Sequence, residues 1–296
     1  GGQDEGKYLT TRDIISYAIT KEAEAGRATS NGGVYLSFEH LLEEELRSAF
    51  GPVIDRLAAN GIDLTKHPIE VAPIAHYHMG GIKVNSRMET RVLGLYAAGE
   101  AVGGANGANR LSGNALVEAF VFGERAGRFS AIYARSKERG WSNKSGIRHL
   151  DSLNNLISCK HSDDGEHAEL GQIWAELQNL MWQNVGVLRT GLKLEKTLLR
   201  LQSIRANLEE VIPAKGEAFN LTLQDWFDLR AGLLTAEAVT LSAINRTESR
   251  GAHQREDFTE TKESFEKNQS ISLDMNGSLN SSFVTSNNFN ELENVR

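Results

Sequence analysis

The residues best suited to chemistry are two histidines that stand beside paired glycines. His76 and His78 are two positions apart at the end of an extended segment, in residues 76–81 (HYHMGG). Imidazoles donate hydrogen bonds to carboxylates or transfer protons near neutral pH, and paired glycines let a backbone approach a flat ligand closely. A solvated edge strand explains the pair equally well. A zinc site is a weak alternative, because no third ligand stands at a suitable spacing.

Arg110 is a second candidate and lies in residues 107–116 (GANRLSGNAL), where a glycine-rich loop runs into a predicted helix. The free N–H groups of a helix start attract negative charge, and the planar fork of an arginine suits a carboxylate. The alternative is a helix cap whose arginine faces solvent. The glycines at 103–107 lack the GxGxxG pattern and the acidic residue of a dinucleotide-binding fingerprint.

Arg12 is a third candidate, because it falls in the first turn of a helix predicted over residues 8–26. The helix dipole makes a cation unfavourable there, so Arg12 needs an anion, which is either Asp13, another acid or an anionic ligand. A fourth segment, residues 246–258 (RTESRGAHQREDF), alternates in charge. We expect its charged groups to form a salt-bridge network that joins the tail to the body of the protein.

Composition limits what kind of protein positions these residues. The chain has 296 residues, 40% hydrophobic residues, one Cys, a net charge of −7 and a pI near 5.7. This length corresponds to about two domains, at ~100–200 residues each. The acidic balance argues against nucleic acid as the main partner, and a single Cys excludes a disulfide scaffold or a cysteine-ligated cluster held by this chain. We also expect no membrane span and no secretory signal.

Hydrophobic spacing predicts the elements around the candidates. In the first part we expect a strand near 32–38, a helix over 41–60, an extended run at 69–75, a short strand at 94–100 and a helix after the 107–113 loop. Three apolar stripes, at 170–181, 194–208 and 229–243, predict a helical bundle, and residues 142–166 link it to the preceding part. From Ser264 to Arg296, 14 of 33 residues are Ser or Asn, which predicts a loop-rich or partly disordered tail.

Four of these segments, in this order, resemble the flavoprotein subunit of succinate dehydrogenase and fumarate reductase. They are residues 76–81, 94–100 (GLYAAGE), 107–116 and 248–258 (ESRGAHQREDF). Residues 184–189 (NVGVLR) are also similar to the helical-domain signature of that family. The resemblance extends from about Arg12 to Phe258.

The resemblance implies a mixed fold with α+β and α/β parts. The expected parts are a piece of a substrate-capping domain (1–71), the C-terminal segment of a Rossmann-like FAD-binding domain (72–135), an α-helical bundle domain (136–245) and a C-terminal extension (246–296). The family opens with a Rossmann segment that carries GxGxxG and often a flavin-linked His, and neither occurs here. We therefore expect a C-terminal piece of a longer protein or one half of a split subunit.

The resemblance also implies a reaction, in which FAD exchanges a hydride with succinate or fumarate. Arg12 is then the proton-transfer residue, and His76 and Arg110 bind the substrate carboxylates. Tyr77 and His78 are expected to support these groups. The implied flavin contacts are a hydrogen bond to the ribityl chain and a helix start beside the pyrimidine ring: Glu100, Asn114, Ala115 and Leu116. No metal site is expected.

The implied partners are the N-terminal FAD-binding part of the same protein and an iron–sulfur electron-transfer subunit. A separate anchor subunit then provides the only link to the membrane, and the location is cytoplasmic, on the inner face of the cell membrane. L-Aspartate oxidase is an alternative that shares the fold, but it commonly has Cys and Leu where Met79 and Ala252 stand. A truncated, non-catalytic binding or assembly module is the other alternative. The direction of reaction and the electron partner stay open.

Overall fold

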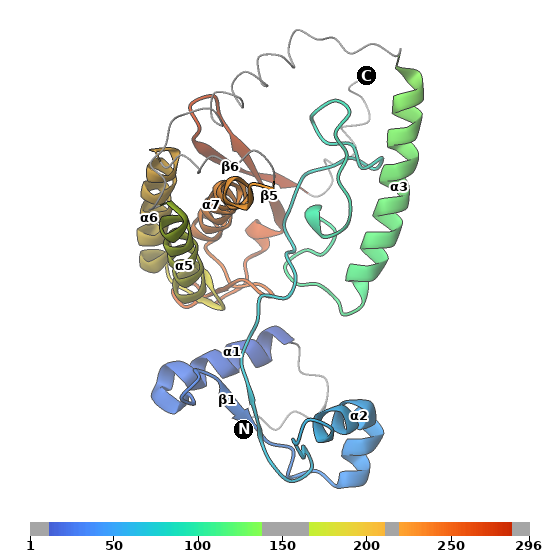
Figure 1. The fold of residues 1–296 in the computed structure, drawn as a ribbon, viewed down its shortest axis with the longest axis vertical. Helices are drawn as coiled ribbons and strands as arrows, with labels where there is room; N and C mark the ends of the chain where they lie inside the picture. The colour runs from blue at the N-terminus through green and yellow to red at the C-terminus, as the bar shows by residue number, and fades with distance from the viewer. Residues whose placement is uncertain (1–11, 138–165, 211–218, 286–296) are drawn as a thin grey trace. The chain divides into compact units, whose positions relative to one another are not determined.

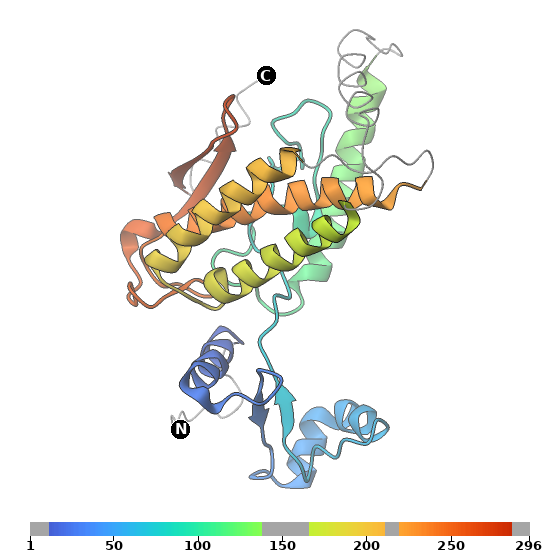
Figure 2. The same ribbon diagram turned by 60° about the vertical axis from the view of Figure 1, so that its left-hand side comes forward.

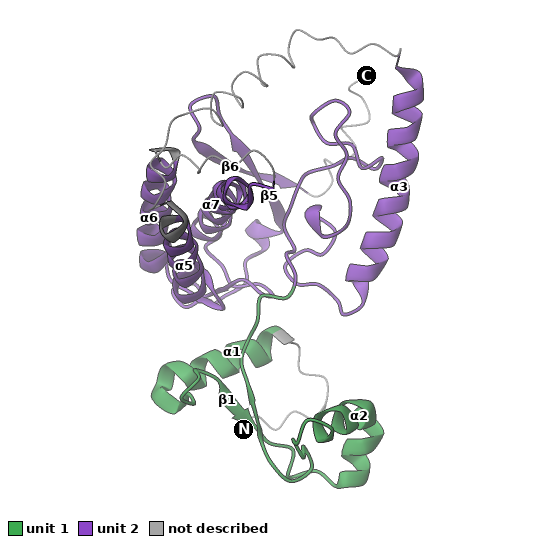
Figure 3. Cartoon of the chain, viewed as in Figure 1, with its two compact units in different colours: residues 1–76 green, residues 77–296 purple. Residues whose placement is uncertain are grey.

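A computed structural model describes residues 12–137, 166–210 and 219–285 of the chain (Figure 1). The chain forms two compact units, residues 1–76 and 77–296, shown in different colours in Figure 3. Over the described ranges, no helix is both long enough and apolar enough to cross a membrane.

Over residues 12–76, the first unit contains two α-helices and a two-stranded sheet, in the order that the sequence predicts. Helix α1 (Arg12–Glu22) continues into a π-helical turn (Ala23–Arg27) that contains Gly26 in a left-handed conformation, φ +79°. Strand β1 (Val34–Leu36), helix α2 (Glu43–Ala58) and strand β2 (Ile69–Val71) follow. The strands pair antiparallel, with Val34 opposite Val71. A small core of Leu46, Ile54 and Leu64 holds α2 in place.

The second unit begins with an irregular segment that packs on one long helix. Residues 77–113 contain isolated bridges, Ile82 with Val102 and Glu89 with Tyr96, and a 3₁₀ turn η2 (Gly99–Ala101). Helix α3 (Asn114–Ser136) lies against this turn, where Gly99 approaches the Cα of Ala119. The strand predicted at 94–100 is wrong. Gly94 and Gly99 have φ of +83° and +67°, so the backbone is not extended at either end and only Tyr96 forms a bridge.

Three helices form the predicted bundle, which Figures 1 and 2 show side by side. They are α5 (Glu166–Val185), α6 (Gly191–Glu210) and α7 (Leu221–Asn245). Leu201 from α6 and Leu229 and Leu233 from α7 are fully buried in their shared core. The start of α7 is capped by Asn220, whose Oδ1 accepts a hydrogen bond from the Leu223 N–H at 3.0 Å. The linking stretch predicted at 142–166 lies outside the described residues, apart from Glu166, which begins α5.

The C-terminal segment is more regular than its composition predicts. Strand β3 (Leu188–Arg189) pairs parallel with β4 (Gln254–Arg255), a 3₁₀ turn η3 (Glu263–Phe265) follows, and β5 (Lys267–Leu273) and β6 (Leu279–Thr285) form an antiparallel hairpin. The predicted loop-rich tail is therefore wrong for residues 267–285.

The physical reason for this hairpin is the chemistry of its turn. The Asp274 carboxylate accepts hydrogen bonds from the backbone N–H groups of Asn276 and Ser278, both at 2.9 Å, and Gly277 takes a φ of +79°. Asx-type turns of this kind close a hairpin without a hydrophobic sequence. Residues 286–296 lie outside the described residues.

Candidate functional site

Arg110 lies in the loop before α3 with its guanidinium stacked on an aromatic ring. Its Cζ is 4.4 Å from the centroid of the Tyr77 ring. One of its N–H groups donates to the carbonyl of Leu111 at 3.1 Å, but its Nε is buried and has no hydrogen-bond partner among the described residues. Over the same residues Arg110 forms no ion pair. A buried donor without an acceptor costs free energy, so the binding of a further acceptor to this guanidinium is favourable.

Tyr77 is held in turn by an acid that the sequence did not single out. The Tyr77 hydroxyl donates to Oε2 of Glu118 at 2.6 Å, and this hydrogen bond raises the pKa of Tyr77. Glu118 lies on α3 and is only 6% exposed. An acid inside the apolar run 115–122 (ALVEAFVF) was the signal available in the sequence, because a buried carboxylate needs a partner. Tyr77 thus connects Arg110 to the body of α3.

Backbone contacts fix the glycine-rich segment that precedes Arg110. The His78 N–H donates to Oε1 of Glu100 at 2.7 Å, and the Ile82 N–H donates to the Ala101 carbonyl at 2.8 Å. A Cβ on Gly81 would lie 2.5 Å from the Ala101 carbonyl oxygen. The sequence predicted that these glycines allow close approach to a ligand. The close approach at Gly81 is instead to a second segment of backbone.

The start of α3 has the chemistry expected of a flavin contact. Gly113 precedes the helix with φ +91° and, as a glycine, has no side chain with which to cap the first turn. The first N–H groups of an α-helix have no acceptor inside the helix, so those of Ala115 and Leu116 can face a carbonyl or an anion. Leu116 is 69% exposed at this turn. Together with the unpaired Nε of Arg110, these groups fit FAD and an anionic substrate.

The three predicted substrate and proton-transfer residues are divided between the two units. Arg12 is the first residue of α1, and its side chain lies outside the described residues. His76 is exposed and is the last residue of the first unit, whereas Arg110 belongs to the second unit. The meeting of Arg12, His76 and Arg110 around one ligand therefore stays a prediction. The same holds for the flavin contacts of Glu100 and Asn114.

The charged segment that follows α7 forms the predicted salt-bridge network. The Glu248 side chain is fully buried between Arg246 and Arg250, with N–O distances of 2.7 and 3.0 Å, and also accepts the Lys262 N–H at 2.9 Å. Burial alone raises the pKa of Glu248, but the hydrogen bonds from Arg250, Lys262 and Arg246 lower it to about 2. Arg246 also donates to the carbonyl of Lys267, at the start of β5. The network therefore joins the C-terminal hairpin to the helical bundle.

A second part of this network holds a buried histidine. Nδ1 of His253 lies 2.9 Å from Nη1 of Arg189, and Nε2 lies 3.0 Å from the Arg246 carbonyl. Since a guanidinium only donates, Nδ1 accepts and Nε2 carries the proton. Burial and the charge of Arg189 lower the pKa of His253 to about 4, and burial with the neighbouring Arg255 lowers that of Arg189 to about 10. The sequence marked 184–189 as a family signature but gave Arg189 no role.

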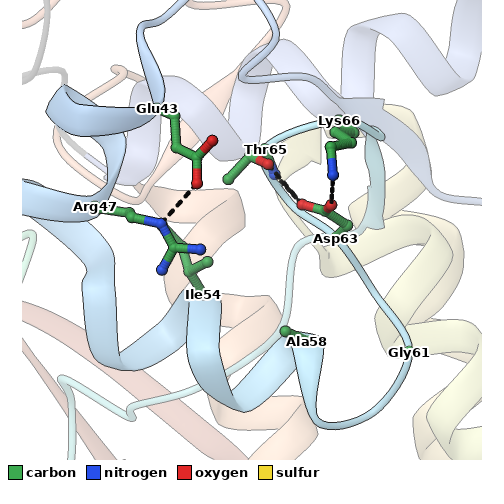
Figure 4. A pocket seen from close by; sticks show the side chains of 8 residues that line it. All are labelled: Glu43, Arg47, Ile54, Ala58, Gly61, Asp63, Thr65 and Lys66. Atoms are coloured by element: carbon green, nitrogen blue, oxygen red, sulfur yellow. Dashed lines mark hydrogen bonds and ion pairs between the residues drawn. The ribbon is translucent and has the colours of Figure 1, made fainter.

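A surface pocket in the first unit offers no comparable free group. It is lined by α2 and by the loop that follows it (Figure 4). Arg47 Nε lies 2.8 Å from Glu43 Oε1, and Lys66 Nζ lies 2.9 Å from Asp63 Oδ2, so both cations are already paired. In the ranges that the structure covers, no cluster of His, Cys, Asp and Glu could hold a metal ion.

Comparison with known proteins agrees with the site chemistry. Residues 3–116 match the family model of an FAD-binding domain, and residues 174–288 match that of the fumarate reductase flavoprotein C-terminus. The fumarate reductase (CoM/CoB) of Methanothermobacter marburgensis has a polypeptide that is 38% identical over 264 residues, 88% of this chain and 47% of that protein. L-Aspartate oxidase of Acinetobacter baylyi is 32% identical over 265 residues, 89% of this chain and 45% of that protein.

A solved structure agrees in fold as well. The flavoprotein of Escherichia coli quinol fumarate reductase superposes with a TM-score of 0.81 at 32% identity, covering 96% of this chain and 50% of that one. The chain spans about half the length of the relatives that it matches. The FAD-binding match and the mixed α/β fold are those predicted. The chain is therefore similar to the flavoproteins of succinate dehydrogenase and fumarate reductase, and residues 174–288 match the C-terminal model of the fumarate reductase flavoprotein.

Proposed function

We propose that this chain forms part of an FAD-dependent oxidoreductase that interconverts succinate and fumarate. The observation that carries the proposal is the Arg110 guanidinium, which is stacked on Tyr77 just before the start of α3 and has a buried Nε without a partner among the described residues. This arrangement suits the binding of a carboxylate by Arg110, whose plane is fixed by the Tyr77 ring. The similarity to fumarate reductase flavoproteins supports the same assignment.

In this proposal three side chains handle the substrate. Arg110 binds one carboxylate through two parallel N–H groups, and stacking on Tyr77 keeps its plane fixed. His76 binds the other carboxylate, so that the double bond of fumarate is polarised between the two groups. Arg12 delivers or removes the proton at the neighbouring carbon. Because a free guanidinium has a pKa above ~12, Arg12 acts only within a relay that restores its proton at once.

The flavin contacts of the proposal lie at η2 and at the start of α3. FAD, when bound, supplies the hydride acceptor or donor of the reaction. One oxygen of Glu100 holds the His78 backbone, and the second would accept a hydrogen bond from the ribityl chain. The helix start at Asn114, Ala115 and Leu116 would face the pyrimidine edge of the flavin, and the N–H groups of Ala115 and Leu116 would point to it, since the Asn114 N–H already donates to the Leu111 carbonyl at 3.3 Å. Their partial positive charge favours the reduced, anionic ring.

The proposed partners include the rest of the FAD-binding domain. Large apolar side chains of α3 are exposed, with Leu116 at 69% and Phe120 at 75%, which is typical of a surface that another part covers. We assign residues 1–71 to a capping domain, 72–135 to the FAD-binding domain, 136–245 to a helical domain and 246–296 to an extension. An iron–sulfur subunit is the proposed electron partner, and a separate anchor subunit would bring the assembly to the inner face of the membrane.

The experiment uses the flavoprotein that contains this chain, loaded with FAD and kept free of oxygen. We expect succinate to bleach the visible absorbance of the oxidised flavin and fumarate to restore it. Bleaching by L-aspartate but not by succinate would assign the protein to the aspartate oxidase alternative. Failure to retain FAD, with no turnover of either substrate, would support the non-catalytic assembly module instead.

A further inference from the structure

The motif at 250–253 folds into a tight reverse turn whose tip points at the Arg110 loop. Arg250 and His253 exchange both backbone hydrogen bonds, at 2.8 and 3.0 Å, so that Gly251 and Ala252 are the two central residues. Gly251 has φ +55°. A positive φ at the first central residue is what a type II′ turn needs, and glycine adopts it without steric cost.

The tip of this turn touches the backbone two residues before Arg110. The Ala252 N–H donates to the Ala108 carbonyl at 2.9 Å. A Cβ added to Gly251 would lie 2.6 Å from the same carbonyl oxygen and 2.8 Å from its carbon. There is thus no room for a side chain between the turn and the loop, and both contacts are made by backbone atoms.

The turn is rigid because buried charges hold it on both sides. Arg250, its first residue, donates to both oxygens of the buried Glu248 at 3.0 and 3.1 Å. His253, its last residue, is fixed by Arg189 and by the Arg246 carbonyl. The Ser249 hydroxyl accepts the N–H of Arg255 at 2.8 Å, in the strand β4 that pairs with β3. A fixed turn against a loop without regular structure can hold that loop in place.

We propose that the turn formed by Gly251 and Ala252 positions Arg110, so that the segment that follows α7 sets how tightly the enzyme binds the substrate carboxylate. This inference rests on the proposed function of Arg110 and adds Gly251 and Ala252 as positioning residues. Neither residue touches the substrate in this account. A displacement of Ala108 moves the fork of Arg110 relative to its ligand, and displacements of about 1 Å cost up to ~100-fold in catalysis.

The test compares two substitutions of one glycine with a matched control, in the FAD-loaded flavoprotein. Gly251→Ala and Gly251→Asn both place a Cβ against Ala108. Asn tolerates a left-handed backbone better than Ala, so backbone strain alone would make Gly251→Asn the milder change. Collision of the added side chain with Ala108 would instead make Gly251→Asn at least as severe as Gly251→Ala. Gly277→Ala is the control, because Gly277 has φ +79° but nothing within 4 Å of an added Cβ.

Two readouts are measured for each variant: hydrogen exchange of the peptide covering residues 106–112 and of the Ala252 amide, and the KM and kcat for succinate. We expect faster exchange and a KM raised about 10–100-fold in both Gly251 variants, with a much smaller change in kcat and with FAD retained. Gly277→Ala should leave exchange at 106–112 and the KM unchanged.

Several results would overturn the inference. Unchanged exchange at 106–112 in both Gly251 variants would show that the turn does not hold the loop. Faster exchange with an unchanged KM would show that the loop does not control substrate binding. A KM that rises for Gly251→Ala but not for Gly251→Asn would assign the effect to backbone strain. If the unmodified enzyme does not oxidise succinate, the proposed function fails, and the exchange comparison still decides whether the turn positions the loop.

Discussion

The second unit contains arginines in two contrasting situations. Arg255 is 3% exposed, and each of its three guanidinium nitrogens donates to the chain: Nε and Nη2 bind the Asp257 carboxylate at 2.8 and 2.9 Å, and Nη1 binds the Ala243 carbonyl at 2.7 Å. Arg110 binds one carbonyl, stacks on Tyr77 and keeps a buried Nε without an acceptor in the described part of the chain.

This difference separates structural from functional charge. A guanidinium whose donors are saturated by the chain stabilises the fold and has nothing left for a ligand. One that is oriented but unsaturated is ready to bind an anion, and the cost of leaving its donor unpaired is recovered when the ligand arrives. The contrast predicts that changes in the first group alter stability and changes in the second alter substrate binding.

The largest effect on stability is expected for Glu248→Ala. The substitution leaves Arg246 and Arg250 close together without their shared carboxylate, and breaking a buried ion pair costs about 3–5 kcal/mol of unfolding free energy. Glu266→Ala is the matched control, since Glu266 pairs with the same Arg250 at 3.8 Å but is 67% exposed. Surface pairs contribute about 0–1 kcal/mol. Urea unfolding measures both, and equal losses would contradict the contrast.

The next effect is a dependence of stability on pH that comes from His253. Its pKa is about 4 in the folded chain against 6.5 for the free side chain. The unfolded chain therefore takes up a proton that the folded chain refuses, and stability is lost as pH falls from 6.5 to about 4. The shift corresponds to roughly 3 kcal/mol at most.

Unfolding free energies of the native chain and of His253→Gln, measured across this pH range, test the assignment. The variant should lose this part of the pH dependence, although it is less stable near neutral pH. Glu248 and Asp257 have pKa values of about 2 in the folded chain, below the ordinary carboxyl pKa near 4. The stability that these two carboxylates contribute is therefore lost only at lower pH. An unchanged slope between pH 6.5 and 4 in the variant would show that another group titrates.

Much of the fold could be predicted from sequence because helical periodicity reports burial directly. The stripes at 170–181, 194–208 and 229–243 each became a helix with its apolar side in the core. The β5–β6 hairpin could not be found this way, since its turn is closed by the Asp274 carboxylate and its strands are rich in Ser and Asn. The strand at 94–100 failed because two glycines with positive φ interrupt it.

The site was predictable in part. The motif around Arg110 pointed to an anion, and the structure gives that residue a buried donor without a partner in the described ranges. Glu118 and Arg189 were missed because their roles depend on partners that are 41 and 64 positions away in sequence. The meeting of Arg12 and His76 with Arg110 involves two units and stays a prediction.

A smaller effect is expected for Tyr77→Phe, which separates the two roles of this residue. The ring remains under Arg110, so the KM for succinate should change less than about threefold. The buried Glu118 loses its donor, which costs about 1–3 kcal/mol of unfolding free energy. Tyr96→Phe is the control, because its hydroxyl contacts, at 3.3 and 3.4 Å, are long. A large rise in KM with unchanged stability would show that the Tyr77 hydroxyl acts on the substrate.

The Arg110→Lys substitution tests whether the unsaturated fork of Arg110 binds a substrate carboxylate. We expect kcat/KM for succinate to fall by about 10³-fold, because a point charge cannot replace two parallel N–H donors. The free energy of unfolding and the FAD content should be unchanged. The control is Arg128→Lys, at an exposed arginine of α3, which should leave kcat/KM unchanged as well. A kcat/KM close to that of the unmodified enzyme in Arg110→Lys would contradict the account.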